Sequence, residues 1–111
     1  MFFIISIKNI NIYGDPMDIK SLNTFIHVAE LGSFSKAGER LGYSQPTVSV
    51  QIRQLEQALG CQLFDRVGHM VRLTEKGQDA LFYAQKILRL TQQMSQDTSA
   101  ENLAVIRLAT A

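Results

Sequence analysis

The sequence has little of several things that mark particular classes of protein. Its 111 residues contain one cysteine, Cys61, and two histidines, His27 and His69, that lie far apart. One cysteine cannot form an internal disulfide, and these three residues match no common zinc or iron–sulfur ligand spacing. The sequence therefore indicates a reducing, cytoplasmic setting and argues against a metal centre.

Excess charge and long apolar runs are missing as well. The formal net charge is only +1, so the charge of the whole chain does not indicate a nucleic-acid partner, and any basic surface must be local. The apolar run from Phe2 to Ile7 is far too short to cross a bilayer and lacks the flanks of a signal peptide. With 46% hydrophobic and 19% charged residues, the chain is typical of a soluble globular domain.

Patterns of catalytic residues do not appear either. The sequence contains no pairing of carboxylates, no Ser/His/Asp order and no glycine-rich phosphate loop. Cys61 follows Gly60 at an apolar position without a basic neighbour, which favours a buried, inert thiol over a redox sensor. We expect neither an enzyme nor a bound cofactor.

The middle of the chain carries three successive helical patterns. A candidate N-cap precedes each one, since Asp and Ser side chains accept from the free N–H groups of a first helical turn. A glycine follows each one, because glycine adopts the left-handed conformation of a helix end without strain. The N-caps are Asp18, then Ser33 or Ser35, then Ser44, and the glycines are Gly32, Gly42 and Gly60.

Apolar residues at helical spacing give each pattern one buried face. These faces are Leu22, Phe25, Ile26 and Ala29, then Phe34, Ala37 and Leu41, then Val48, Ile52, Leu55 and Leu59. Only Tyr43 and Ser44 separate the second pattern from the third, and helices joined so tightly cross steeply. We therefore predict a helix-turn-helix over residues 34–53, whose recognition helix, residues 45–59, lies in the major groove of DNA.

A hairpin pattern follows the recognition helix. Two β-compatible runs, residues 63–66 and 70–73, flank a turn in which Gly68 can adopt a positive φ. A two-stranded hairpin is marginal alone and must pack on the helices. Three helices and such a hairpin predict a mainly α, winged helix-turn-helix domain over residues 17–74, with its wing at 64–73.

The last helical pattern, residues 75–95 after the cap Thr74, is a long one. Its apolar residues form a double stripe, which exceeds what one small three-helix core can cover. We expect it to pair with the same helix of a second copy, as a linker helix of a homodimer; packing entirely on its own domain is the alternative. The predicted dimerisation residues are Ala80, Tyr83, Ala84, Ile87, Leu88, Leu90 and Met94.

The two ends of the chain differ from the domain between them. Residues 1–16 end in the turn signal Gly14-Asp15-Pro16 and are either a strand-prone or disordered leader, or sequence upstream of a natural start at Met17. After the last helix come a polar linker and a strand-like run that has no partner in the sequence. We interpret residues 96–111 as a hinge and the first strand of a larger domain that has been cut off.

Several motifs in a fixed order carry a family resemblance. They are Ser33-Phe34-Ser35-Lys36-Ala37, Arg40-Leu41, Ser44-Gln45-Pro46-Thr47-Val48-Ser49-Val50-Gln51-Ile52, Leu55-Glu56, Leu59-Gly60, Leu63-Phe64-Asp65-Arg66 and Arg72-Leu73-Thr74-Glu75-Lys76-Gly77, after a start at Met17-Asp18. Over residues 17–95 the chain resembles the DNA-binding domain of LysR-type transcriptional regulators. The resemblance implies a winged helix, a dimerising linker helix and a C-terminal effector-sensing domain of periplasmic-binding-protein type. A small-molecule effector would bind only that missing domain.

The chain departs from the pattern of this family at three places. Residues 1–16 have no counterpart in it, which favours Met17 as the natural start. Gly38 stands where a second alanine is common, at a cost in helix propensity of up to ~1 kcal/mol. Val50 stands where many members carry an arginine that faces DNA, and a contact with a thymine methyl group could replace the guanine contact.

The outward face of the recognition helix is expected to read DNA. Gln45 lies at the helix start, where its amide can pair with N6 and N7 of adenine. Ser49 suits a phosphate or a base, and the alternative is a merely exposed serine. Arg53 suits a phosphate or a guanine, and the alternative is a weak surface salt bridge with Glu56 or Glu39.

Further contacts are expected on either side of that helix. Ser35 and Lys36 can hold a phosphate at a helix N-terminus, and Arg72 suits the narrow minor groove. Arg66 either contacts DNA or pairs with an acidic neighbour, and His69 is either a contact or an exposed loop residue. The predicted DNA-binding residues are Ser35, Lys36, Ser44, Gln45, Pro46, Thr47, Ser49, Val50, Arg53, Arg66, His69 and Arg72.

These features predict a sequence-specific, dimeric transcription regulator that binds double-stranded DNA without membrane association, metal or catalysis. A higher oligomer is left open for the full-length protein. Two recognition helices related by a two-fold axis would contact half-sites about one helical turn apart. The alternative from another class is a winged-helix module for protein–protein interaction, and the salt dependence of duplex binding separates the two.

Overall fold

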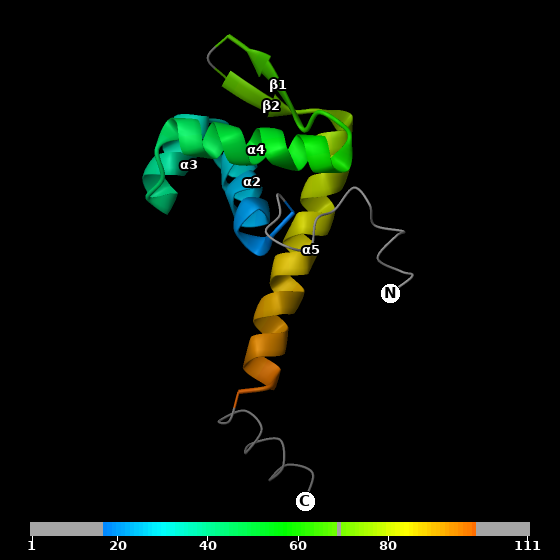
Figure 1. Ribbon diagram of the computed structural model, residues 1–111. Helices are drawn as coiled ribbons and strands as arrows, with labels where there is room; N and C mark the ends of the chain where they lie inside the picture. The colour runs from blue at the N-terminus through cyan, green and yellow to red at the C-terminus, as the bar shows by residue number, and fades with distance from the viewer. Residues whose placement is uncertain (1–16, 69, 100–111) are drawn as a thin grey trace, which may run out of the picture.

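The computed structural model describes residues 17–68 and 70–99. The elements are α2 (Ile19–Leu31), α3 (Phe34–Leu41), α4 (Gln45–Leu59), β1 (Phe64–Val67), β2 (Met70–Leu73) and α5 (Glu75–Asp97). Figure 1 shows α4 lying between the hairpin on one side and α2 on the other, with α5 leading away from the hairpin. The expectations for residues 1–16, for His69 and for residues 100–111 lie outside the described residues.

The helices begin and end where the sequence indicates. In all four, the N-cap side chain accepts from the amide three residues later; the N-caps are Asp18, Ser33, Ser44 and Thr74. Ser33 rather than Ser35 caps α3, with 3.1 Å between its hydroxyl oxygen and the amide nitrogen of Lys36. The predicted glycines Gly32, Gly42 and Gly60 each have a positive φ at a helix end. The final helix extends two residues beyond the predicted Ser95.

Small residues on α3 let α4 cross it closely. Ala37 is fully buried, and Gly38 lies against the turn between the two helices. A Cβ atom on Gly38 would come within 2.6 Å of the carbonyl oxygen of Tyr43 and 3.5 Å of the Val48 side chain. This close approach explains why glycine is present despite its lower helix propensity, because any larger residue would push the turn away.

The wing is an antiparallel hairpin that is anchored at its base. Its register pairs Phe64 with Leu73 and Val67 with Met70. Phe64 is buried, and its ring meets those of Phe25 and Phe34 edge to face at centroid distances of 5.4 and 6.0 Å. These contacts attach β1 to α2 and α3, as expected for a short hairpin that is not stable alone.

The core lies where α2, α3, α4, the base of the wing and the first half of α5 meet. The predicted inward face of α4 is confirmed at Val48, Ile52 and Leu55, but Leu59 is 40% exposed and that part of the prediction is wrong. Leu59 lies at the last residue of α4, beyond most of the helices that cover the rest of this face. Cys61 is half-buried against the core.

Candidate nucleic-acid interface

The outward face of α4 carries the side chains predicted to read DNA. Gln45, Pro46 and Arg53 are exposed, Val50 is 43% exposed, and Ser49 is half-buried toward the wing. At 100° per residue Pro46, Val50 and Arg53 are centred opposite Val48, Ile52 and Leu55 of the core. The buried face of α4 therefore fixes which of its side chains a nucleic acid could meet.

Two predicted contact residues at the start of α4 are engaged in its cap. The Ser44 hydroxyl accepts from the amide of Thr47 at 3.3 Å and lies 2.8 Å from the hydroxyl of the same residue. Both side chains are exposed. Ser44 and Thr47 thus stabilise the first turn of α4, next to Gln45.

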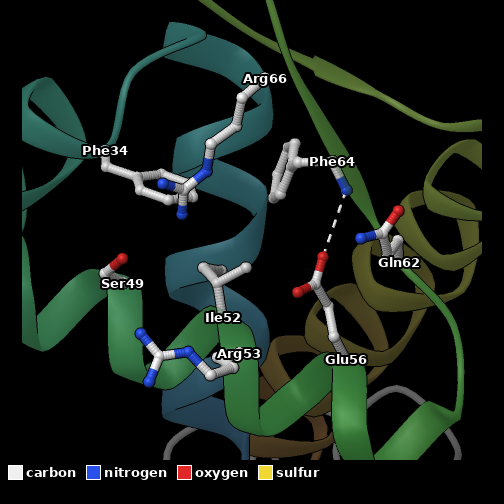
Figure 2. Close-up of a pocket in the computed structure, with 8 residues that line it drawn as sticks. All are labelled: Phe34, Ser49, Ile52, Arg53, Glu56, Gln62, Phe64 and Arg66. Carbon is white, nitrogen blue, oxygen red and sulfur yellow. Dashed lines mark hydrogen bonds between the residues drawn. The ribbon is translucent and has the colours of Figure 1, made fainter.

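A cleft separates α4 from the wing (Figure 2). Its volume is about 320 Å³, and Ser49 and Arg53 line it from α4, while Gln62 lines it from the segment before β1 and Phe64 and Arg66 line it from β1 itself. The guanidinium of Arg66 lies over the ring of Phe34, 4.8 Å from the ring centre, which is the geometry of a cation–π contact. The cleft brings together two of the predicted cations, one from each side.

The acidic partners considered for these arginines are not used. In the described part of the chain, Arg53 forms no salt bridge with Glu56 or Glu39, and Arg66 forms none with Asp65 or Glu56. Both guanidinium groups are therefore free of carboxylate partners in residues 17–68 and 70–99. A phosphate could approach either one without displacing an ion pair.

A second recess joins the wing to the N-termini of α3 and α4. It measures about 200 Å³, and Ser35, Gln45 and Arg66 contribute to its lining along with Gly68 and Val71. Three of the predicted contact residues from three separate elements therefore meet at one place. Lys36 is exposed beside it on the first turn of α3.

The two arginines of the wing lie on opposite faces of the hairpin. Side chains alternate along a strand, so Arg66 shares a face with the buried Phe64, and Arg72, which pairs with Asp65, is on the other face. Arg72 is exposed on that outer face. Both arginines were predicted to contact DNA; in the structure Arg66 lines the cleft and Arg72 lies on the outer face of the hairpin.

Glu56 is a residue of this region that the sequence analysis considered only as a salt-bridge partner. One of its carboxylate oxygens, Oε2, accepts from the amide of Leu63 at 2.8 Å and from that of Phe64 at 3.4 Å. Figure 2 shows this side chain reaching from α4 to the start of β1. Glu56 lies in the last turn of α4, three residues before its end at Leu59, and the sequence gave no sign of this contact.

The predicted dimerisation residues divide into two groups. Ala84 is only 1% exposed and packs in the core of its own chain, so it is removed from the predicted dimer face; Ala80 and Leu88 are half-buried beside it. Four others remain exposed on α5; they are Tyr83, Ile87, Leu90 and Met94. We call these four the outer stripe of α5.

An apolar groove runs beside the outer stripe. Its volume is about 240 Å³, and Leu59, Tyr83 and Ile87 line it along with residues of the core.

None of the helices in residues 17–68 and 70–99 combines the length and the hydropathy needed to cross a bilayer.

Comparison with protein families gives one match that covers more than half of the chain. The model of bacterial regulatory helix-turn-helix proteins of the lysR family matches residues 19–78. That span runs from the start of α2 into the first turn of α5.

Curated proteins with similar sequences are regulators of the same type. An uncharacterized HTH-type transcriptional regulator in the ibpB-leuC intergenic region of Azotobacter vinelandii is 60% identical over 72 residues, which are 65% of this chain and 50% of that protein. The HTH-type transcriptional regulator CitR of Bacillus subtilis (strain 168) is 46% identical over 72 residues, which are 65% of this chain and 25% of that protein. The chain thus spans half or less of the length of these two relatives.

Solved structures with the same fold include protein–DNA complexes. The CbnR_DBD–DNA complex superposes with a TM-score of 0.72 at 35% identity and covers 74% of this chain and 94% of that chain. The complex of BenM_DBD with benA site 1 DNA superposes with a TM-score of 0.71 at 39% identity and covers 74% of this chain and 92% of that chain.

Proposed function

The chain belongs to the lysR family of bacterial regulatory helix-turn-helix proteins, and from that premise we propose that it is a dimeric, sequence-specific DNA-binding transcription regulator. The observation that carries the proposal is the exposed outward face of α4, which has polar side chains opposite a buried core face. Similar domains at 35% and 39% identity are described in complex with DNA.

In the proposed complex α4 lies in the major groove. Gln45 begins the helix, and its amide pairs with an adenine edge, because amide and adenine have matching donors and acceptors. Arg53, two turns later and without a carboxylate partner among the described residues, contacts a phosphate or a guanine. Ser35 and Lys36 hold a phosphate at the N-terminus of α3.

The wing supplies the second set of contacts. Arg72 points outward from β2 and is the side chain that we assign to the minor groove, where a narrow groove attracts a guanidinium. Arg66 contacts the phosphates between the two grooves, since its guanidinium lies in the cleft beside α4. These cations form a local basic surface, which DNA binding requires even though the net charge of the whole chain is only +1.

The outer stripe of α5 is the surface that we assign to a second copy of the chain. Tyr83, Leu90 and Met94 are each more than half exposed, and apolar side chains that recur at three- and four-residue steps pack well against a like helix. A two-fold dimer places two recognition helices on half-sites about one helical turn apart.

We propose further that this DNA binding needs no metal ion or cofactor and takes place in the cytoplasm. Residues 17–68 and 70–99 contain no group of three or more His, Cys, Asp or Glu side chains placed to hold a metal ion. Unchanged DNA affinity after treatment with a chelator is the expected result.

The experiment that tests the proposal measures DNA affinity as a function of salt. A duplex selected by this chain from a random pool and a scrambled duplex of equal length are titrated by fluorescence anisotropy at 50 and 200 mM salt. Phosphate contacts predict a loss of affinity of about 10³-fold or more over this range, with the selected duplex bound more tightly at both salt concentrations. No binding of either duplex at 50 mM would contradict the proposal and favour the protein–protein interaction module.

A further inference from the structure

The connection between α4 and the wing converges on one side chain. The backbone carbonyl of Glu56 accepts from the amides of Gly60 and Cys61, at 2.8 and 3.2 Å, and ends the helix. The carboxylate of the same residue accepts from the amides of Leu63 and Phe64 and begins the strand. Four backbone donors of the turn are therefore satisfied by a single residue of the recognition helix.

The carboxylate is well suited to this role. Backbone N–H groups that leave a helix and have not yet joined a sheet need another acceptor when they are partly buried. Oε2 reaches both amides from one position, and an uncharged amide oxygen at the same reach can accept from them as well. Leu63 and Phe64 are both buried, so few water molecules can replace the carboxylate there.

The opposite side of the same segment is held by the start of α5. The Thr74 hydroxyl donates to the carbonyl of Gln62 at 2.6 Å, and the Thr74 amide donates to the carbonyl of Leu63 at 2.9 Å. Gly77 lies so close that a Cβ atom on it would overlap the carbonyl oxygen of Leu63. The base of the wing is thus clamped between Glu56 of α4 and the first turn of α5.

This clamp sets where the wing lies relative to the recognition face. Arg53 is three residues before Glu56 on α4, and Arg66 is two residues after Phe64 on the same face of β1. We propose that Glu56 is a positioning residue for DNA binding: it holds the wing at a fixed place beside α4, so that helix and wing contact adjacent grooves at once. This inference rests on the proposed DNA-binding function and assigns no DNA contact to Glu56 itself.

The position of the wing matters because α4 and the wing must contact DNA at the same time. A contact set is effective when its members are held within about 0.5 Å of the productive geometry. Without the Glu56 contact, strands of four residues would lose their hydrogen bonds to the α4 side chain and would be held by the packing of Phe64 on α2 and α3 and by the bonds of Thr74. The wing would then move against α4, and its contacts would cost ordering entropy on every binding event.

Two substitutions separate reach from charge at this position. Glu56→Gln keeps the length and one carbonyl oxygen as an acceptor, whereas Glu56→Asp keeps the charge but is about 1.5 Å shorter. Glu30→Gln and Glu30→Asp, at an exposed glutamate of α2, are matched controls for the effect of charge and length on DNA affinity. All four substitutions are small and should leave the fold intact. Circular dichroism of each variant checks this before the DNA assays.

The test combines footprints of both grooves with amide exchange. The probe is the duplex selected from a random pool; guanine N7 methylation reports on α4 in the major groove, and hydroxyl-radical cleavage reports on the wing in the minor groove. We expect Glu56→Asp to lose the minor-groove protection, to keep the major-groove protection and to bind about tenfold more weakly. Glu56→Gln should behave like the parent chain within about threefold, and amides 63 and 64 of the free protein should exchange faster only in Glu56→Asp.

Two results would overturn the inference, and both differ from a failure of the proposed function. One is Glu56→Asp with both protections and unchanged exchange, since reach would then be irrelevant. The other is loss of minor-groove protection in Glu56→Gln but not in Glu56→Asp, which would assign the effect to charge. If the parent chain protects neither groove, the proposed DNA binding itself fails.

Discussion

The helices α4 and α5 are built alike on their inner sides and differently on their outer sides. Each packs apolar residues against the core, with Leu55 fully buried on α4 and Ala84 on α5. The outer side of α4 is polar apart from Pro46 and Val50, whereas the outer stripe of α5 is apolar over more than three turns. A polar face is well hydrated until a charged partner displaces the water from it. An apolar stripe of this length is costly to leave exposed to water.

The two outer faces favour different partners. The outer face of α4 has exposed hydrogen-bonding groups, Gln45 and Arg53 among them, which suit base edges and phosphates, and it would gain little from an apolar partner. The outer stripe of α5 has no hydrogen-bonding groups except the Tyr83 hydroxyl, so its binding energy comes from burial of area. Substitutions on the two helices should therefore affect two different measurements.

The largest effect is expected from a charge in the outer stripe. Leu90→Glu places a carboxylate where Leu90 is 57% exposed in the single chain and buried in the proposed dimer, so the chain should become monomeric at tens of micromolar. Sedimentation velocity measures this directly. The loss of the second recognition helix should weaken binding to a two-half-site duplex by about a hundredfold or more.

The control for this substitution is Gln85→Glu, which adds the same charge at an exposed position on the polar side of α5. It should remain dimeric and bind DNA nearly as before. A Leu90→Glu variant that stays dimeric would contradict the assignment of the outer stripe to a second copy, because the stripe would then have no role in assembly.

The next effect concerns the packing of α4 against α3 and the stability of the fold, not the binding of DNA. Gly38→Ala would normally stabilise a helix, but here the new Cβ meets the Tyr43 carbonyl oxygen at 2.6 Å. We expect the free energy of unfolding, measured by urea denaturation, to fall by about 2 kcal/mol. The neighbouring exposed Glu39→Ala should change it by no more than about 0.5 kcal/mol, and a more stable Gly38→Ala variant would show that the turn can move aside.

Much of this architecture follows from local signals in the sequence. The caps at Asp18 and Ser44 and the glycines that end the helices are local features, and they predict both ends of α2 and α4 and the end of α3; the start of α3 was left between Ser33 and Ser35. The outward set of α4 follows from helical periodicity once its core face is known. The two strands of the wing are likewise indicated by two short runs around the turn at Gly68, although β1 begins at Phe64, one residue later than predicted.

What the sequence could not predict depends on tertiary placement. The contact of Glu56 joins residues seven and eight apart across a turn whose path is set by α5. Ala84 and Leu59 differ in burial from the prediction because only the crossing of α5 over α2 decides which apolar residues are covered. The separation of Arg66 from Arg72 requires the strand register, which shows that one faces the helices and the other does not.

A smaller effect compares the same residue type on the two helices. Arg53→Ala should weaken the binding of selected and scrambled duplexes alike by about tenfold and reduce the salt slope by about 1, as expected for the loss of one phosphate contact. Arg89→Ala, on an exposed part of α5, should change neither quantity. Titrations at several salt concentrations measure both, and a loss confined to the selected duplex would assign Arg53 to a base instead.

The smallest effect concerns the one branched apolar side chain on the outer face of α4. Val50 is 43% exposed, and a single apolar side chain in the major groove can be covered by the 5-methyl group of thymine. Replacing single thymines of the selected duplex by deoxyuridine removes that methyl group and leaves base pairing unchanged. At one position per half-site this should weaken binding by about fourfold, the value of one buried methyl group. Val50→Ala should be insensitive to the same replacement. Equal sensitivity of both proteins at every thymine would show that Val50 does not contact the methyl group. The outer face of α4 would then act through its polar residues alone.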